Sequence, residues 1–271
     1  MEGVASQPQE TRETVPDFVP GALADYARIR VEGYFRGSVD TAQVLPVNTG
    51  RQVLSLHGRA MIVRDQAQFT RPFLCRVGPR WWTRQIGPAT GDTWANTFLE
   101  SVLISDLRMQ KIEMRMENPP MDLLIYNAPV AGASWEHLTY DDVPCRPQPQ
   151  CLAYRWRGLP EGGQPVTFTT VLLPHPPSAD APAARDLAAR IKTWRHDAQV
   201  TILSLGPFEL RGLYPAETWW VVFNDTGATV SAGAVSTDAK VAVLVVRDGR
   251  VSQQWSLDQR PVTFQPGGAT P

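Results

Sequence analysis

The stretch from Trp219 to Phe264 constrains the fold more than any other part of the sequence. Within it, Val241 to Val246 is a continuous apolar run with the length and residue types of a strand buried on both faces. Asp248-Gly249 follows directly and favours a two-residue hairpin, because a type I′ turn needs φ > 0 at both central residues. Beyond the turn, apolar and polar side chains alternate. The stretch predicts a β-meander, which needs further sheets to pack against.

The rest of the chain shows the same short alternating pattern. Strands are predicted at 53–56 and 60–63, with Arg64-Asp65 closing the second of them, and other short strands follow along the chain. Ser178 to Trp194 is the one stretch whose apolar residues recur at helical spacing. Helices do not alternate with strands, so a parallel sheet is not expected. The sequence therefore predicts an all-β fold, a large antiparallel β-sandwich with one short helix.

The predicted domain organisation is simple. Residues 1–25 are expected to form a disordered leader, 26–265 one β-sandwich domain, and 266–271 a short tail. Cys145 and Cys151 bracket a proline-rich loop, which makes 145–151 the best position for a subdomain boundary. The two thiols could bridge across this short loop or remain free, and the spacing favours neither state.

Composition excludes several classes of function. The formal net charge of −1 argues against broad electrostatic binding of nucleic acid. No run of 18 apolar residues predicts a membrane span, and the first twenty residues lack the pattern of a signal peptide, so no membrane association is expected and the default location is cytoplasmic. The four histidines lack ligand spacing, so neither a metal site nor a cofactor is predicted. Of these, His175 is expected in an exposed loop, because it lies between two prolines.

Four segments resemble a known family. They are GRAMIVRD, DTWANTFLESVLISDLRMQKIEMRMENPPMDLLIYN, FTTVLLPHPPSADAPAARDLAARI and STDAKVAVLVVRDGRV. Together, between Ile29 and Phe264, they resemble the C-terminal β-sandwich region of heparinase II/III-like polysaccharide lyases. In that region a buried strand ends in arginine-aspartate, a strand precedes a short alanine-rich helix, and a hairpin ends the domain.

The resemblance implies a partner as well as a fold. In the family, a helical α/α toroid precedes the sandwich, and a tyrosine and a histidine between them act as acid and base on a uronic acid. This chain has no segment before Ile29 that could form a toroid, and it lacks the family's histidine-bearing, glycine-rich segment, so no catalytic residue carries over. The resemblance therefore implies an accessory or separated sandwich. Its implied partners are an anionic polysaccharide, such as a glycosaminoglycan, and a helical toroid protein or domain.

Two tryptophan pairs, Trp81-Trp82 and Trp219-Trp220, lie on predicted strands. Neighbouring side chains of a strand point to opposite faces, so one member of each pair should enter the core and the other should face outward unless a second layer covers it. Arg80, Trp82 and Arg84 share one parity, and we predict them as ligand-binding residues. An indole can stack on a sugar ring, and guanidinium groups bind carboxylate or sulfate through paired hydrogen bonds.

The loop with His137 and Tyr140 supplies a candidate catalytic pair. Elimination from a uronic acid needs a base at C5 and an acid for the leaving oxygen, and these side chain types can fill both roles. Three functions follow as alternatives. The leading one is a non-catalytic, carbohydrate-associated sandwich that binds or helps enclose an anionic polysaccharide. The others are a small polysaccharide lyase that works through the pair, and a structural or assembly protein that uses a sandwich face as an interface.

Overall fold

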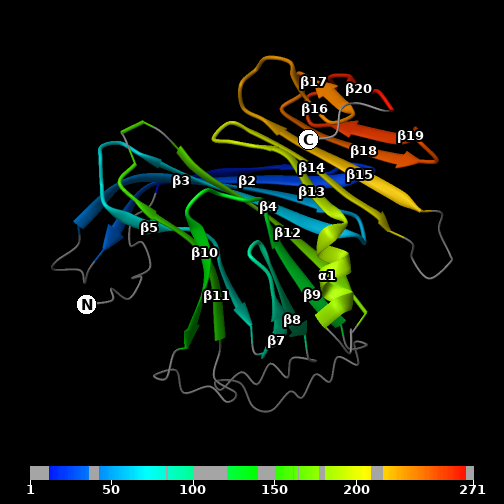
Figure 1. Ribbon diagram of the computed structural model, residues 1–271. Helices are drawn as coiled ribbons and strands as arrows, with labels where there is room; N and C mark the ends of the chain where they lie inside the picture. Colours follow the sequence, from blue (N-terminus) through cyan, green and yellow to red (C-terminus); the bar gives the residue numbers. More distant parts are fainter. Residues whose placement is uncertain are drawn as a thin grey trace, which may run out of the picture.

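A computed structural model describes residues 12–36, 43–83, 85–99, 121–139, 150–160, 162–163, 165–176, 181–208 and 216–266. Most of these residues lie in antiparallel strands, and the helix α1 (Ala181–Ala189) packs near β7, β9 and β13. The expected all-β fold with one short helix is therefore confirmed (Figure 1).

The strands form four sheets, which we name A to D. Sheet A has the order β1 (Arg12–Val19), β2 (Ala24–Arg36), β3 (Gln43–Leu56), β4 (Ala60–Phe69), β12 (Pro165–His175), β9 (Met121–Asn127), β8 (Trp94–Leu99) and β7 (Gln85–Thr90). In sheet B, the central strand β11 (Gln150–Gly158) pairs with β10 (Ala133–Thr139) on one side and with β5 (Cys75–Val77) and β6 (Arg80–Thr83) on the other. Sheet C has the order β13 (Ile191–His196), β14 (Val200–Phe208), β15 (Glu217–Asn224), β18 (Val241–Arg247) and β19 (Arg250–Ser256). Sheet D consists of β16 (Val230–Ala232), β17 (Val235–Thr237) and β20 (Val262–Phe264).

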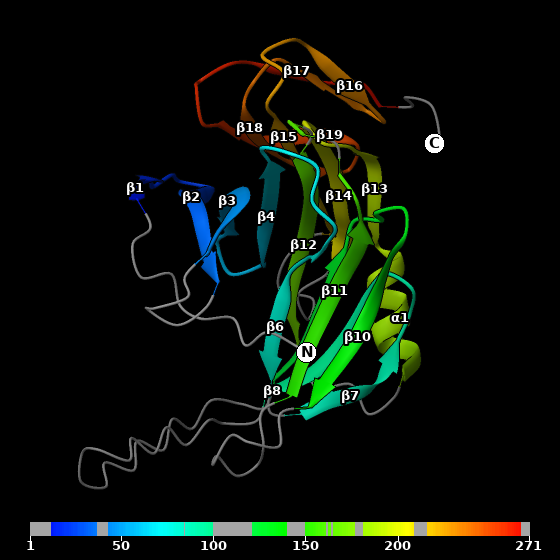
Figure 2. The ribbon, with the colours of Figure 1, turned by 90° about the vertical axis from the view of Figure 1, so that its left-hand side faces the viewer.

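The sheets stack in the order B, A, C, D (Figure 2). The largest apolar cluster joins sheet A to sheet C, where Leu54 and Val171 meet Val221. A second cluster joins sheet C to sheet D, and a smaller third one joins sheet A to sheet B. Because sheet A contributes opposite faces to two clusters, its strand β12 is mostly apolar and buried.

The C-terminal meander forms as its sequence predicts. β18 is buried along nearly its whole length, and Asp248 and Gly249 have φ values of 49° and 71° in the turn to β19. Trp219 packs in the cluster between sheets A and C, while Trp220 packs between sheets C and D. Sheet D is thus the second layer that covers Trp220, while sheet A covers Trp219, so both members of this tryptophan pair are buried.

Three expected boundaries are wrong. Residues 12–19, expected in a leader, form the edge strand β1, which accommodates Pro16 because a β-bulge interrupts its pairing there and an edge strand needs fewer ladder bonds. β4 continues through Arg64-Asp65 to Phe69. The helix ends at Ala189, and residues 191–196 become the strand β13, because their backbone pairs with β14.

His175 is also placed differently from its expectation. It ends β12 and is buried, with Nε2 2.9 Å from Oδ1 of Asn96 and Nδ1 2.8 Å from the carbonyl oxygen of Pro176. Asn96 in turn donates to the buried carboxylate of Asp122 across 3.3 Å. Burial lowers the pKa of the His175 imidazole. The flanking prolines are compatible with this position because it lies at the end of the strand.

Candidate functional site: an arginine face on sheet B

The inner face of sheet B is apolar and aromatic. Trp81, Trp135 and Leu152 pack against Ala95 and Ile125 of sheet A. The ring of Tyr154 lies 5.3 Å from that of Trp135 and 6.5 Å from that of Phe168, in tilted and edge-on arrangements that aromatic rings favour. Trp81 is thus the member of its pair that faces the core. Because side chains alternate along a strand, the residues next to these in sequence project from the outer face of sheet B.

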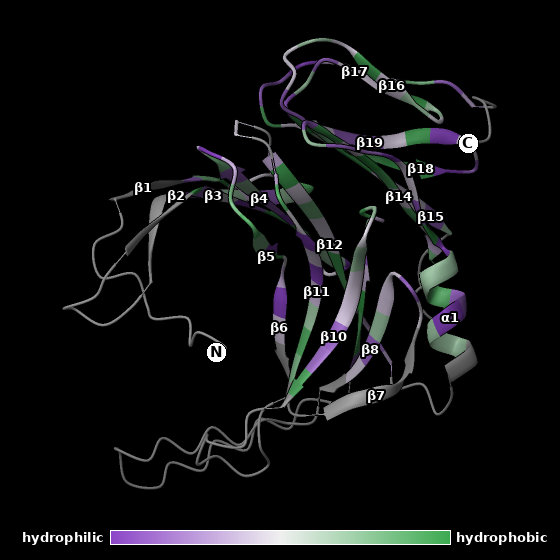
Figure 3. Cartoon of the chain, turned by 60° about the vertical axis from the view of Figure 1, so that its left-hand side comes forward, coloured by the Kyte–Doolittle hydropathy of each residue, from purple (hydrophilic) through white to green (hydrophobic). Residues whose placement is uncertain are grey.

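The outer face carries a group of arginines. In the register of sheet B, Arg76 lies opposite Arg157, Arg80 lies opposite Ala153, and Arg155 lies opposite Ser134. Residues directly opposite each other in antiparallel strands project from the same face, so these side chains share one surface. We call it the arginine face, and it comprises Arg76, Arg80, Arg155 and Arg157 with Ser134 and Glu136. The hydrophilic segments of β6, β10 and β11 lie side by side there (Figure 3).

Positive charge dominates this face. Glu136 is its one carboxylate among the described residues, and it pairs with Arg76 and, across 3.3 Å, with Arg155. Arg80 and Arg157 are exposed. Arg76 and Arg157 are direct cross-strand neighbours, an arrangement in which like charges destabilise a sheet. An anion from solution that lies over such a surface relieves the repulsion between these charges, so its binding is favourable.

Local geometry keeps the four guanidinium groups together. β5 and β6 hold one continuous register with β11 although Gly78-Pro79 separates them. A side chain at Gly78 would place its Cβ 1.9 Å from the carbonyl oxygen of Tyr154, so only glycine allows this close approach.

Burial raises the pKa of the Cys151 thiol, and the nearby guanidinium groups of Arg80 and Arg155 oppose that shift. Cys151 is a free thiol.

The structure brings together only part of the predicted site. Arg80 is on the arginine face, and Trp82 lies in β6 opposite Cys151, but the side chain of Trp82 and the whole of Arg84 lie outside the described residues. His137 is exposed on β10, and Tyr140 lies outside the described part, so the predicted catalytic pair remains a prediction. Sequence reasoning missed Arg155 and Arg157, although their spacing of two residues on a strand was the available signal.

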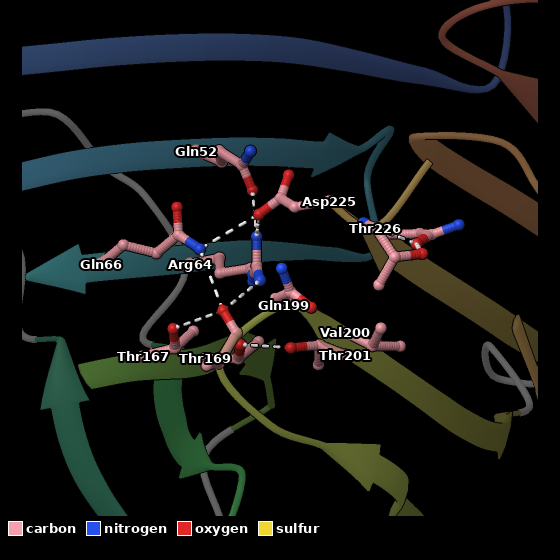
Figure 4. A network of polar contacts seen from close by, with 12 residues as sticks. Gln52, Arg64, Gln66, Thr167, Thr169, Gln199, Val200, Thr201, Asp225 and Thr226 are labelled. Carbon is pink, nitrogen blue, oxygen red and sulfur yellow. Dashed lines mark hydrogen bonds and ion pairs between the residues drawn. The ribbon is translucent and has the colours of Figure 1, made fainter. Parts of the chain in front are cut away.

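A second polar cluster lies between sheets A and C (Figure 4). Arg64 is fully buried, and its guanidinium donates to Asp225 across 2.5 Å, to Gln52 across 3.1 Å and to the carbonyl oxygen of Ala198 across 3.3 Å. Gln66 donates to the same carboxylate and the same carbonyl. The cluster satisfies its polar groups largely from within and ties β4 to the loops at one end of sheet C. The contacts of the cluster therefore connect sheets A and C.

His196 adjoins this cluster and is expected to make folding stability depend on pH. Its Nε2 donates to the carbonyl oxygen of Thr167 across 3.2 Å, so Nδ1 accepts from the hydroxyl of Thr201 across 3.0 Å. Burial is the main cause that lowers the imidazole pKa to about 4, and the charge of Arg64 acts in the same direction. The ring is neutral in the folded protein at pH 7.

In the unfolded chain this histidine binds a proton below about pH 6.5. In the folded chain it binds one only below about pH 4. Stability should therefore fall as the pH falls through this window, by roughly 3 kcal/mol from His196 alone. Urea unfolding at several pH values checks this. The loss of stability at low pH should be smaller in His196→Gln. Part of the loss that remains comes from His175, because burial also lowers the pKa of that imidazole. Equal falls in both proteins would contradict the assignment.

Comparisons with known proteins add no further identification. No family model matches the sequence, and no curated protein matches it. In the described part of the chain, no three His, Cys, Asp or Glu side chains gather as a metal site. The same residues contain no helix that is long and apolar enough to cross a membrane. The fold and the arginine face thus define an all-β protein with a cationic sheet surface.

Proposed function

We propose that this chain is a non-catalytic, carbohydrate-associated β-sandwich that binds an anionic polysaccharide through the arginine face. The observation that carries the proposal is the excess of guanidinium groups over carboxylates on one sheet surface, including the like-charged neighbours Arg76 and Arg157. As the resemblance of sequence pattern implies, the proposed counterpart of this chain is the C-terminal half of a heparinase II/III-like lyase. A helical toroid protein or domain would supply the acid and base of any cleavage.

The shape of the surface suits a polymer better than a small ion. The arginines lie on β11 and on β5 and β6, which follow one another along the same edge of β11, so they are spread over one sheet face. Each exposed charge pair contributes only about 0–1 kcal/mol, so useful affinity needs several contacts at once. A polysaccharide with repeated carboxylate or sulfate groups provides them on one molecule. Trp82 and Arg84 share the sequence parity of Arg80 and remain part of the proposal as binding residues predicted from the sequence.

Removal of two exposed arginines should weaken polysaccharide binding. In Arg80→Ala/Arg157→Ala, we expect affinity for heparin to fall about tenfold, because two exposed charge pairs are lost. The salt dependence of binding should fall as well, since such pairs are screened by ions. Glu136→Gln should instead raise affinity a few-fold, because a carboxylate that competes for Arg76 and Arg155 is removed. Calorimetry at two salt concentrations measures each effect.

The matched control is Arg250→Ala, since Arg250 is exposed at the start of β19 in sheet C. Its affinity for heparin should equal that of the unmodified protein. Hyaluronan, which carries carboxylates without sulfates, compares the two acid groups on the same surface. An equal loss in Arg250→Ala and in the double variant would show that only the overall charge matters, and the proposed surface would be wrong.

The isolated chain is expected to lack lyase activity. In the family that the chain resembles, the catalytic tyrosine and histidine act between a helical toroid and the sandwich, so the sandwich by itself is not expected to cleave a polysaccharide. The measurement is the ultraviolet absorbance of unsaturated product during incubation with heparin, heparan sulfate, alginate and hyaluronan. Turnover that disappears in His137→Ala and in Tyr140→Phe would establish the lyase alternative instead.

A further inference from the structure

A recess of about 390 Å³ lies beside β19, the last strand of sheet C. It opens between β19 and the segment that leads to β20, near the top right of the molecule in Figure 1. One wall consists of three consecutive residues of β19, Gln254, Trp255 and Ser256, and the other consists of residues 259–262.

The three residues of β19 project from both faces of the strand. Gln254 lies opposite Leu244, which belongs to the cluster between sheets C and D, and Ser256 projects from the same face. Trp255 packs toward sheet A on the opposite face. Residues from both faces touch the recess, so it follows the edge of β19 in the plane of sheet C.

The backbone of β19 presents hydrogen-bonding groups to this edge. The N–H of Leu257 donates to the carbonyl oxygen of Val241 across 2.9 Å, so in this register β18 bonds to Leu257 and Trp255. The residues between them alternate with these, so the N–H and C=O of Gln254 and the N–H of Ser256 point away from β18. Among the described strands, none pairs with β19 on that side.

The part of the edge beside the recess has no protection against pairing. Natural edge strands are blunted by charged side chains, proline or a β-bulge. The bulge of β19 lies near Ser252, where its register with β18 shifts, close to the hairpin turn. Residues 253–257 contain no charged residue and no proline. Gln254 is exposed, so this edge is open to another strand.

The opposite wall of the recess is held in place by its own contacts. Arg260 is paired with Asp238 across 2.7 Å and with Asp258 across 3.4 Å, and the hydroxyl of Thr237 donates to the carbonyl oxygen of Pro261 across 2.9 Å. Because this wall faces β19, the broad edge of a second folded copy would meet the wall before it reached the strand. A single extended segment can lie between them.

We propose that the recess binds an extended, uncharged peptide segment of a partner protein, which adds to sheet C as a strand beside β19. Main-chain hydrogen bonds to Gln254 supply the affinity of this mode of recognition, and alternate side chains of the peptide reach the two faces of the sheet. The two carboxylates beside Arg260 offset its charge, so an uncharged segment suits the recess. The site shares no residue with the arginine face and goes beyond the proposed function.

The test uses the full chain and a capped hexapeptide of alternating threonine and valine as the probe. Hydrogen exchange followed by NMR should show that the peptide slows exchange of the backbone amide of Gln254. The same peptide with methylated amide nitrogens cannot donate main-chain hydrogen bonds. Titration should therefore show that it binds at least tenfold more weakly to the unmodified protein.

Gln254→Pro removes the N–H that faces the recess, and affinity for the peptide should fall about tenfold. Proline is tolerated in an edge strand where the N–H points away from the ladder, so thermal unfolding should show that the variant remains folded. The matched control is Gln254→Thr, which changes the same side chain and keeps the N–H. It should bind the peptide as the unmodified protein does.

Four results would overturn the proposal: binding of neither peptide, equal affinity for both peptides, equal affinity in Gln254→Pro and Gln254→Thr, or a dimer in sedimentation that Gln254→Pro dissociates. The last result would assign the edge of β19 to a second copy of the chain. Each of them leaves heparin binding at the arginine face unaffected, so the two proposals fail independently.

Discussion

Replacement of Arg64 with alanine is expected to lower the free energy of unfolding by about 2–4 kcal/mol, because a buried guanidinium loses its hydrogen bonds and leaves a cavity, although its counter-charge Asp225 is exposed. The guanidinium of Arg64 is fully buried and bonds to Asp225, Gln52 and a backbone carbonyl at once. Its loss leaves the buried amide of Gln52 without this donor and opens a cavity beside the ring of Phe223, which lies 5.9 Å from the guanidinium carbon. Both effects act against the folded state.

Arg51→Ala is the matched control for this variant. Arg51 lies on the neighbouring strand β3, is half-exposed, and bonds to Asp65 across 2.6 Å. Exposed pairs contribute little, so the change should stay within about 1 kcal/mol. Urea unfolding at pH 7 measures both variants. A similar small loss in the two proteins would mean that the cluster around Arg64 does not join sheets A and C energetically.

Replacement of Trp81 with alanine is expected to destabilise the fold by about 3–4 kcal/mol, the lower part of the range for aromatic core deletions because the indole keeps some exposure. Trp81 packs between sheets A and B, where the apolar cluster is the smallest of the three. Few other side chains can fill the space that it leaves, so sheet B should loosen from sheet A. Weaker heparin binding should accompany this change, because the arginines lie on the same sheet.

Leu74→Ala is the control for the loss of apolar surface. Leu74 directly precedes β5 and is 66% exposed, so its truncation should change stability by less than about 0.5 kcal/mol. Thermal unfolding followed by near-ultraviolet circular dichroism reports the tertiary packing of the tryptophans. An unchanged unfolding temperature in Trp81→Ala would contradict its assignment to the core side of sheet B.

Local features of the sequence predicted the architecture well where neighbouring residues decide it. The hairpin at Asp248-Gly249 depends on two residues that accept positive φ, and the buried strand before it depends on an unbroken apolar run. The alternation at Trp81-Trp82 likewise predicted that one member of the pair would face the core, and Trp81 does so. These properties follow from the backbone and from side chain polarity over a few residues, so no knowledge of the partner strand is needed.

Tertiary structure alone decided the features that depend on distant segments. Arg64 marked the end of a predicted strand, yet it is buried within the fold because Asp225, 161 residues further on, supplies its counter-charge. The arginine face exists because β11 pairs with β5 and β6, which brings Arg155 and Arg157 beside Arg76 and Arg80. Alternation within one strand predicts which residues share a face, but strand pairing decides which faces join. Strand pairing depends on how much apolar surface the whole chain buries. The sequence of a single segment does not contain that information.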